Sequence, residues 1–132
     1  MGINSTEVSY GFGQMGSAFN DGAALMKPPT GKVFIAITML ADTTFEAHGG
    51  LVAQQDSAGG GLEYISTETA AGAAQTAHDA SDGSETTSTG SGGLVVDGSN
   101  TFPKGVTIYG RWTRVALSTS YTHGIIVYYG PQ

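Results

Sequence analysis

The segment that decides the fold is KVFIAITML, residues 32–40. It is rich in β-branched and aromatic side chains, which favour a strand over a helix. Strict alternation predicts two sets of side chains, Val33, Ile35, Ile37 and Met39 on one side and Phe34, Ala36, Thr38 and Leu40 on the other. Both sets are mostly apolar, so this strand is expected to be buried on both faces.

A second segment of the same kind is GIIVYY, residues 124–129. Alternation places Ile125, Val127 and Tyr129 on one face of the expected strand and Ile126 and Tyr128 on the other. A chain of 132 residues makes one small domain, in which covering both faces of two such strands is difficult. We therefore expect another subunit to cover one outer face.

Shorter strand candidates surround these two segments and are separated by turn signals such as Asp21-Gly22, Asp82-Gly83, Asp97-Gly98 and Pro28-Pro29. The candidates are residues 7–12, 43–47 running toward Leu51 and Val52, 62–66, 94–96, 106–109 and 111–117. Roughly seven to nine short strands at this spacing are typical of a β-sandwich or jelly roll. The prediction is an all-β protein with a single domain over residues 1–132.

Two segments fall outside this pattern. Residues 67–93 consist mainly of Ala, Ser, Thr and Gly with almost no large apolar side chain, which predicts a long surface loop or an arm that orders against a neighbouring subunit. The alanines within residues 68–79 make this the one candidate helix, although Gly72 weakens it. Residues 1–12 are expected to form a flexible N-terminal arm.

Charge is distributed unevenly along the chain. The net charge is −6, and residues 33–103 hold nine of the eleven acids and no Lys or Arg, whereas residues 104–132 hold Lys104, Arg111 and Arg114 and no acid. The basic segment is suited to contact with an acidic partner or with the acidic part of the chain itself. Nucleic acid is not an expected partner, because five scattered bases do not form the clustered basic surface that phosphates require.

Composition excludes several kinds of chemistry. The chain has no cysteine, so disulfides, thiolate metal sites and cysteine nucleophiles are absent. There is no apolar run of about eighteen residues and no leader with a cleavage site, so neither a membrane span nor a secretory signal is expected.

The motifs that could indicate catalysis or ligand binding lack their usual context. Residues 11–16 match G-x-G-x-x-G, but no helix signal follows, so a glycine-rich strand edge or bulge is the better interpretation. His48, His78 and His123 have no second His at metal-ligand spacing. The acidic segment around His78 lacks the alternation of a calcium loop and is interpreted as a solvated loop. No nucleophile elbow or marked pair of carboxylates is present, so we expect no enzyme activity, no cofactor and no metal.

Aromatic residues concentrate in the last quarter of the chain: Tyr109, Trp112, Tyr121, Tyr128 and Tyr129. Exposed aromatic rings on a β-sandwich suit stacking on sugars, whereas buried rings serve as core or interface anchors. Glycan binding through exposed Trp112 or Tyr121 is therefore one open hypothesis.

The two ends of the chain resemble a known group of proteins. FPKGVTIYGRW at 102–112 and GIIVYYG at 124–130, together with NSTEVSYGFGQ at 4–14, PTGKV at 29–33 and ADTTF at 41–45, are similar to small virion structural proteins of tailed phages, especially those of marine cyanobacteria. The resemblance spans nearly the whole chain, and its motifs are short and rich in glycine.

This resemblance implies a non-enzymatic capsid decoration protein on the surface of the virion. Such a protein forms homo-oligomers, often trimers, and binds the lattice of the major capsid protein. The contacts with other subunits and with the shell are then expected from Val8, Tyr10, Phe12, Phe34, Arg111, Trp112, Arg114, Ile126 and Tyr128. Two alternatives stay open, a carbohydrate-binding module at the tip of a tail fibre or spike, and a subunit that assembles into tubes or filaments.

Overall fold

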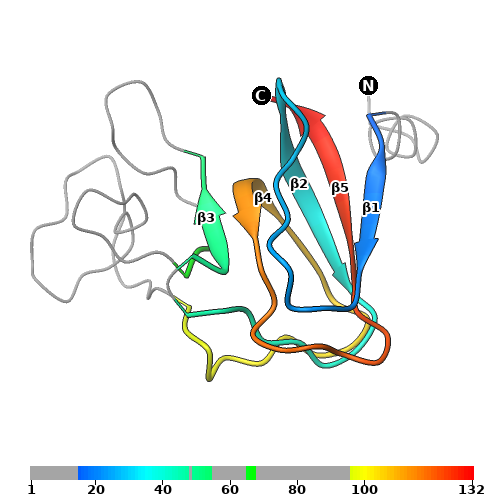
Figure 1. Cartoon of the computed structure of the whole chain (residues 1–132), viewed down its shortest axis with the longest axis vertical. Helices are drawn as coiled ribbons and strands as arrows, with labels where there is room; N and C mark the ends of the chain where they lie inside the picture. Colours follow the sequence, from blue (N-terminus) through cyan, green and yellow to red (C-terminus); the bar gives the residue numbers. More distant parts are fainter. Residues whose placement is uncertain (1–14, 48, 55–64, 68–95) are drawn as a thin grey trace, which may run out of the picture.

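The computed structural model describes residues 15–47, 49–54, 65–67 and 96–132. These residues contain five strands and no helix, so the all-β prediction is confirmed for this part of the chain. The strands are β1 (Ser17–Asn20), β2 (Lys32–Met39), β3 (Leu51–Ala53), β4 (Thr107–Val115) and β5 (Ile125–Pro131). They form one antiparallel sheet in the order β1-β5-β2-β4-β3, with the two most apolar segments at its centre (Figure 1).

The expected alternation along β2 is wrong at one position. The register with β5 shifts between Phe34 and Ala36, so Ile35 is an extra residue that forms a bulge. Phe34 therefore joins Ile37 and Met39 in the buried core instead of facing the other way. The alternation predicted for residues 124–129 agrees with the register, which pairs Val127 with Ile37.

Residues 107–115 form one bent strand, β4, rather than the two that we expected at 106–109 and 111–117. The first part of β4 pairs with β2 and its last part pairs with β3, with register shifts in both ladders. Gly110 lies at this bend, and a Cβ there would come within 2.7 Å of Cζ2 of Trp112. The absence of a side chain at Gly110 lets the indole pack beside the backbone.

The inner face of the sheet carries the core. Its strand residues are Phe34, Ile37, Met39, Leu51, Ile108, Trp112, Val115, Ile125 and Val127. Connecting segments cover this face and contribute Phe45, Leu117 and Phe102, with the Phe45 and Phe102 rings edge to face at 5.4 Å between centroids. The core thus lies between the sheet and its own connections.

The connecting segments also pair with one another. Thr43 and Phe102 exchange two backbone hydrogen bonds of 2.8 and 2.7 Å, and the Glu46 N–H donates to the Ala116 carbonyl at 3.0 Å. Residues 43–46 therefore run between residue 102 and residues 116–118, as the strand candidate at 43–47 predicted in part. The side chains alternate there, with Thr43 and Phe45 buried and Glu46 exposed.

Several predictions concern residues outside the described part of the chain. These are the arm at 1–12 with its strand at 7–12, the helix at 68–79, nearly all of the loop at 67–93, and most of the strand candidates at 62–66 and 94–96. In contrast, β1 was not expected at all. The turn at Asp97 is present, with the Ser99 N–H and hydroxyl both donating to Asp97 Oδ1. These bonds lower the pKa of Asp97 below its ordinary value.

Candidate functional site

The outer face of the sheet is the candidate site. It includes these strand residues, which point away from the core: Ser17, Phe19, Ala36, Thr38, Thr107, Tyr109, Ile126 and Tyr128. Ala36 among them is buried, with 1% of its surface exposed. None of these side chains carries a charge at neutral pH. Phe19 and Tyr109 are 59% and 62% exposed, which is unusual for large apolar groups on strands. Aromatic enrichment together with absence of charge is characteristic of the centre of a binding surface.

A hollow of about 200 Å³ opens on this face over the middle of β2. Ala36 pairs with Tyr109 of β4 on one side and with Tyr128 of β5 on the other, so the small alanine lies between two tyrosines. Thr38 and Thr107 complete the lining, and their hydroxyl groups hydrogen-bond to each other at 2.8 Å. We call this hollow the tyrosine slot.

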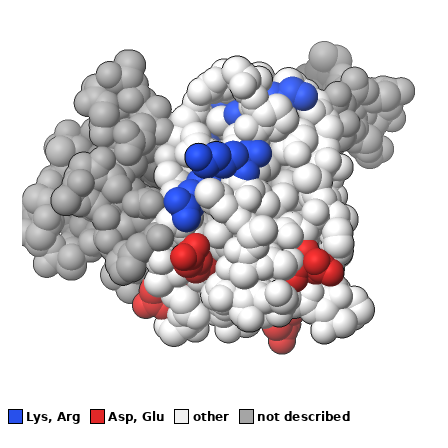
Figure 2. Space-filling view, viewed as in Figure 1, with Lys and Arg blue, Asp and Glu red and all other residues white. Residues whose placement is uncertain are grey.

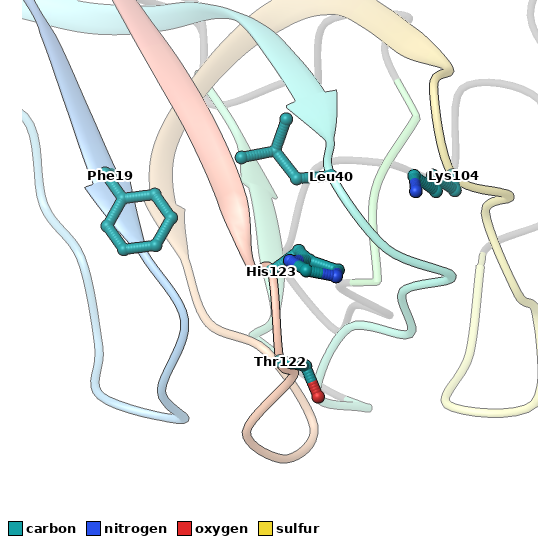
Figure 3. A pocket seen from close by; sticks show the side chains of 5 residues that line it. All are labelled: Phe19, Leu40, Lys104, Thr122 and His123. Carbon is teal, nitrogen blue, oxygen red and sulfur yellow. The ribbon is translucent and has the colours of Figure 1, made fainter.

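A second, larger hollow of about 410 Å³ lies at the end of the same strands, where Leu40 follows β2. It is lined by Phe19, Leu40, Lys104, Thr122 and His123. Figure 3 shows Phe19 from β1 and Lys104 from the segment before β4 on opposite sides of Leu40 and His123. We call this hollow the lysine hollow.

The basic side chains near β4 are engaged within the chain. Arg111 Nε donates to Gln54 Oε1 at 2.6 Å, and its Nη2 donates to the Pro131 carbonyl. Arg114 lies 3.8 Å from the Glu46 carboxylate. Figure 2 shows the Lys and Arg side chains in the upper part of the face in view and the acidic side chains in its lower part.

The residues predicted to form subunit or shell contacts are divided by the structure. Ile126 and Tyr128 lie half-buried on the outer face. Phe34 and Trp112 have no exposed surface and belong to the core, so the expectation that their side chains contact a partner is corrected. Val8, Tyr10 and Phe12 lie outside the described residues.

The aromatic residues proposed for sugar stacking are also redistributed. Trp112 is buried, and its Nε1–H donates to the Ile65 carbonyl at 2.6 Å. Tyr121 is half-buried, and its hydroxyl hydrogen-bonds with Thr44 and Ser118. Burial raises the pKa of the Tyr121 hydroxyl, but these hydrogen bonds outweigh it and the pKa lies below its ordinary value. Tyr121 thus joins two loops, and Tyr109 is the exposed ring.

Sequence reasoning missed Phe19, Ala36 and Leu40 as parts of a site and did not select Tyr109. Alternation from buried Ile108 would have placed Tyr109 on the outer face. Phe19 had no comparable signal, because β1 is only four residues long and follows Gly16, whose φ is +100°. The strand that follows residues 11–16 is not the helix that a dinucleotide site requires.

Within the described ranges, no three His, Asp or Glu side chains are close enough together to hold a metal ion. His48 and His78 are outside those ranges, and His123 lines the lysine hollow. The same part of the chain has no helix that is long and apolar enough to span a bilayer.

No protein-family model matches the chain, and comparison with curated proteins and with solved structures found no match either. The resemblance to phage structural proteins therefore stays a prediction based on its short motifs.

Proposed function

We propose that this chain is a non-enzymatic structural subunit of a phage virion, a decoration protein that binds the assembled head on its outer surface. The partners are further copies of the chain, as a trimer, and the lattice of the major capsid protein. The resemblance of residues 102–112 and 124–130 to such proteins supports this function. The structural observation that carries the proposal is the open edge of β1.

Strand β1 lies at the end of the sheet and, among the described strands, pairs only with β5. The Tyr129 N–H donates to the Gly16 carbonyl at 2.9 Å. In an antiparallel pair the backbone groups of alternate residues point to the partner strand, so Gly16, Ala18 and Asn20 direct their N–H and C=O groups to β5. Ser17 and Phe19 therefore direct theirs to the open side. The edge has no Lys or Pro, the residues that commonly protect a strand from pairing with another chain.

The N-terminal arm is the proposed partner of this edge. In residues 1–12, apolar side chains alternate at Val8, Tyr10 and Phe12, as in a strand with one apolar side. Addition of this segment to β1 of a neighbouring copy would be β-augmentation, in which backbone hydrogen bonds supply affinity and alternate side chains supply specificity. Such a contact is heterologous, and three of them close a ring.

The proposal takes the fold as a β-sandwich of the jelly-roll type. Pairing of residues 43–46 with residues 102 and 116–118 supports a second layer opposite the five-stranded sheet. The bend of β4 is of the kind by which a strand passes from one sheet to the other.

Stabilisation of the head requires no chemical step. A subunit that binds the expanded shell but not its precursor shifts the equilibrium toward the expanded state by mass action. A trimer multiplies this effect, because three linked contacts act at a high effective concentration.

The experiment compares the full chain, a chain lacking residues 1–12 and the variant Ser17→Pro. Light scattering on a sizing column should give a trimer of the 13.5 kDa chain for the first protein and monomers for the other two. Co-sedimentation with undecorated expanded heads should show strong binding only for the first. Proline at position 17 removes an outward-pointing N–H and leaves the ladder with β5 intact.

Mixing provides the control. The truncated chain retains the β1 edge, and Ser17→Pro retains the arm, so an equimolar mixture should form a heterodimer that neither protein forms alone. A full-length chain that is monomeric both in solution and on heads, or a truncated chain that still forms trimers, would contradict the proposed assembly.

A further inference from the structure

Phe19 is an exposed aromatic residue at the open edge of β1. Its side chain is 59% exposed on the outer face, where it borders the lysine hollow (Figure 3). Its backbone N–H and C=O point away from β5, as do those of Ser17, and among the described residues they have no hydrogen-bond partner. The edge therefore offers donors and acceptors for another strand, with an apolar ring beside them.

The other side of β1 is already occupied by the chain itself. Asn20 lies on that side, where its side-chain amide donates to the Gly22 carbonyl at 2.9 Å and its Oδ1 accepts the Gly22 N–H at 3.1 Å. Ala18 packs against the core, as does Met26 from the segment that follows. A strand added beside β1 thus finds room for large side chains next to Phe19 rather than next to Ala18 or Asn20.

The N-terminal arm carries its large side chains in one row. Val8, Tyr10 and Phe12 are separated by one small residue each, and residues 8–12 include no proline that would lack a backbone donor. As a strand these five residues span about 17 Å, which covers the four residues of β1. The arm joins the described residues at Met15, directly before β1, so every copy of the chain carries an arm and an open edge.

We propose that the arm of a neighbouring copy pairs antiparallel with β1, with Tyr10 directly opposite Phe19 and the apolar row on the outer face. This register rests on the arm exchange proposed above and specifies it. Tyr10 is the middle residue of the row, so Phe12 then lies opposite Ser17.

Two physical effects favour this arrangement. A cross-strand aromatic pair stabilises antiparallel strands, and Tyr10 would cover the exposed ring of Phe19. An antiparallel partner also satisfies both outward backbone groups of Phe19 through one residue, because opposite residues at such a position exchange both hydrogen bonds. Phe19 is therefore the anchor that selects the side and the register of the arm.

Cysteine cross-linking tests this register, because the chain has no cysteine of its own. Opposite residues at a hydrogen-bonded position have Cα atoms about 5.5 Å apart, within the roughly 4.4–6.8 Å that a disulfide spans. The double variant Tyr10→Cys/Phe19→Cys is oxidised with diamide at a concentration where light scattering shows the trimer. It should give covalent trimers on a non-reducing gel, and reduction should return the monomer. Ser9→Cys/Phe19→Cys is the matched control and should give no cross-link, because its two side chains point to opposite faces.

A second pair of double variants tests the direction of the arm. In the antiparallel register, Phe12→Cys/Ser17→Cys should cross-link and Val8→Cys/Ser17→Cys should not. The reverse result would show a parallel arm and overturn the proposed register.

Phe19→Ala measures the contribution of the ring. It should raise the concentration at which half of the trimer dissociates at least about tenfold, which corresponds to the loss of a single good contact. Because the ring is mostly exposed, the circular dichroism spectrum should stay that of a folded sheet. Tyr109→Ala is the control, because this exposed aromatic residue of the same face is separated from β1 by β5 and β2, and it should leave the trimer unchanged.

The outcomes separate this register from the arm exchange itself. A full chain that is a trimer, with no cross-link in Tyr10→Cys/Phe19→Cys or with equal cross-linking in the Ser9→Cys control, would overturn the register and leave the exchange standing. A disulfide within one chain, seen as a monomer that migrates faster than its reduced form, would show that the arm folds back on its own β1. That result would contradict both proposals.

Discussion

Replacement of Trp112 by alanine should destabilise the protein severely. The side chain is fully buried, and a buried tryptophan removes roughly 150–250 Å² from water. At about 25 cal/mol per Å² this amounts to about 4–6 kcal/mol as an upper estimate. Loss of the hydrogen bond to the Ile65 carbonyl adds about 1 kcal/mol.

We therefore expect Trp112→Ala to lower the free energy of unfolding by about 4–5 kcal/mol, in line with aromatic-to-alanine changes in other cores. Tyr109→Ala, three residues away on the outer face, should cost only about 1 kcal/mol because the ring is mostly exposed. Trp112→Phe separates the two contributions, since it retains most of the packing and loses the N–H donor.

Urea unfolding followed by far-ultraviolet circular dichroism measures all three variants, with stability taken from the midpoint at constant m-value. The single tryptophan supplies a second readout, because its fluorescence in the native protein should be blue-shifted relative to free tryptophan in water. A loss below about 1 kcal/mol for Trp112→Ala, or native fluorescence like that of free tryptophan, would refute the assignment of this residue to the core.

Three further predictions concern single positions. Gly124→Ala should lower the free energy of unfolding by well over the roughly 1–3 kcal/mol expected for a strained positive φ, because its Cβ would lie 2.3 Å from a backbone carbonyl oxygen at the end of β1. Gly105→Ala should cost only the strain, because Gly105 also has a positive φ but has open space around it. Thermal unfolding compares the two variants. In an NMR pH series, Asp97 should titrate below its ordinary pKa of 3.8, and Ser99→Ala should raise this pKa. Because the pKa is lower in the folded state, ionised Asp97 stabilises the folded turn at pH values above 3.8. This stabilisation is lost as the pH falls through the folded pKa. Tyr121→Phe should lower stability by about 1 kcal/mol, and ultraviolet titration of the unmodified protein should show one tyrosine ionising below 10.0 that the variant lacks.

The central strands could be predicted because their composition leaves few alternatives. In residues 32–40 and 124–129, β-branched and aromatic side chains are dense enough to specify strands without knowledge of their neighbours. The division of β4 into two candidates was wrong, because Gly110 and Arg111 resemble a turn along the chain but occupy a bulge opposite β2. Strand β1 was missed because SAFN owes its strand geometry to pairing with β5 rather than to its own composition.

The candidate site was less predictable for a related reason. Both sides of residues 32–40 are apolar, so the hydrophobic pattern does not reveal the bulge at Ile35, and a shift of one residue exchanges the two faces. The same uncertainty applies to Trp112 and Tyr109, which are both aromatic residues of β4. Alternation puts them on opposite faces of the strand, and the structure places Trp112 beside Ile108 in the core and leaves Tyr109 on the outer face.

The bulge determines which residues of β2 belong to the outer face of the sheet. Strict alternation would put Phe34 and Ala36 on the same face, and the phenyl ring would then lie beside the slot. The extra residue at Ile35 turns Phe34 inward, where its ring lies 5.7 Å from that of Tyr129, and leaves Ala36 as the outward residue between two tyrosines. Gly130 contributes to the same arrangement, since a Cβ there would come within 2.4 Å of Ile35 Cγ2. The irregularity that completes the core therefore also decides which small side chain lies between the two tyrosines of the outer face, as expected for bulges that reorient side chains.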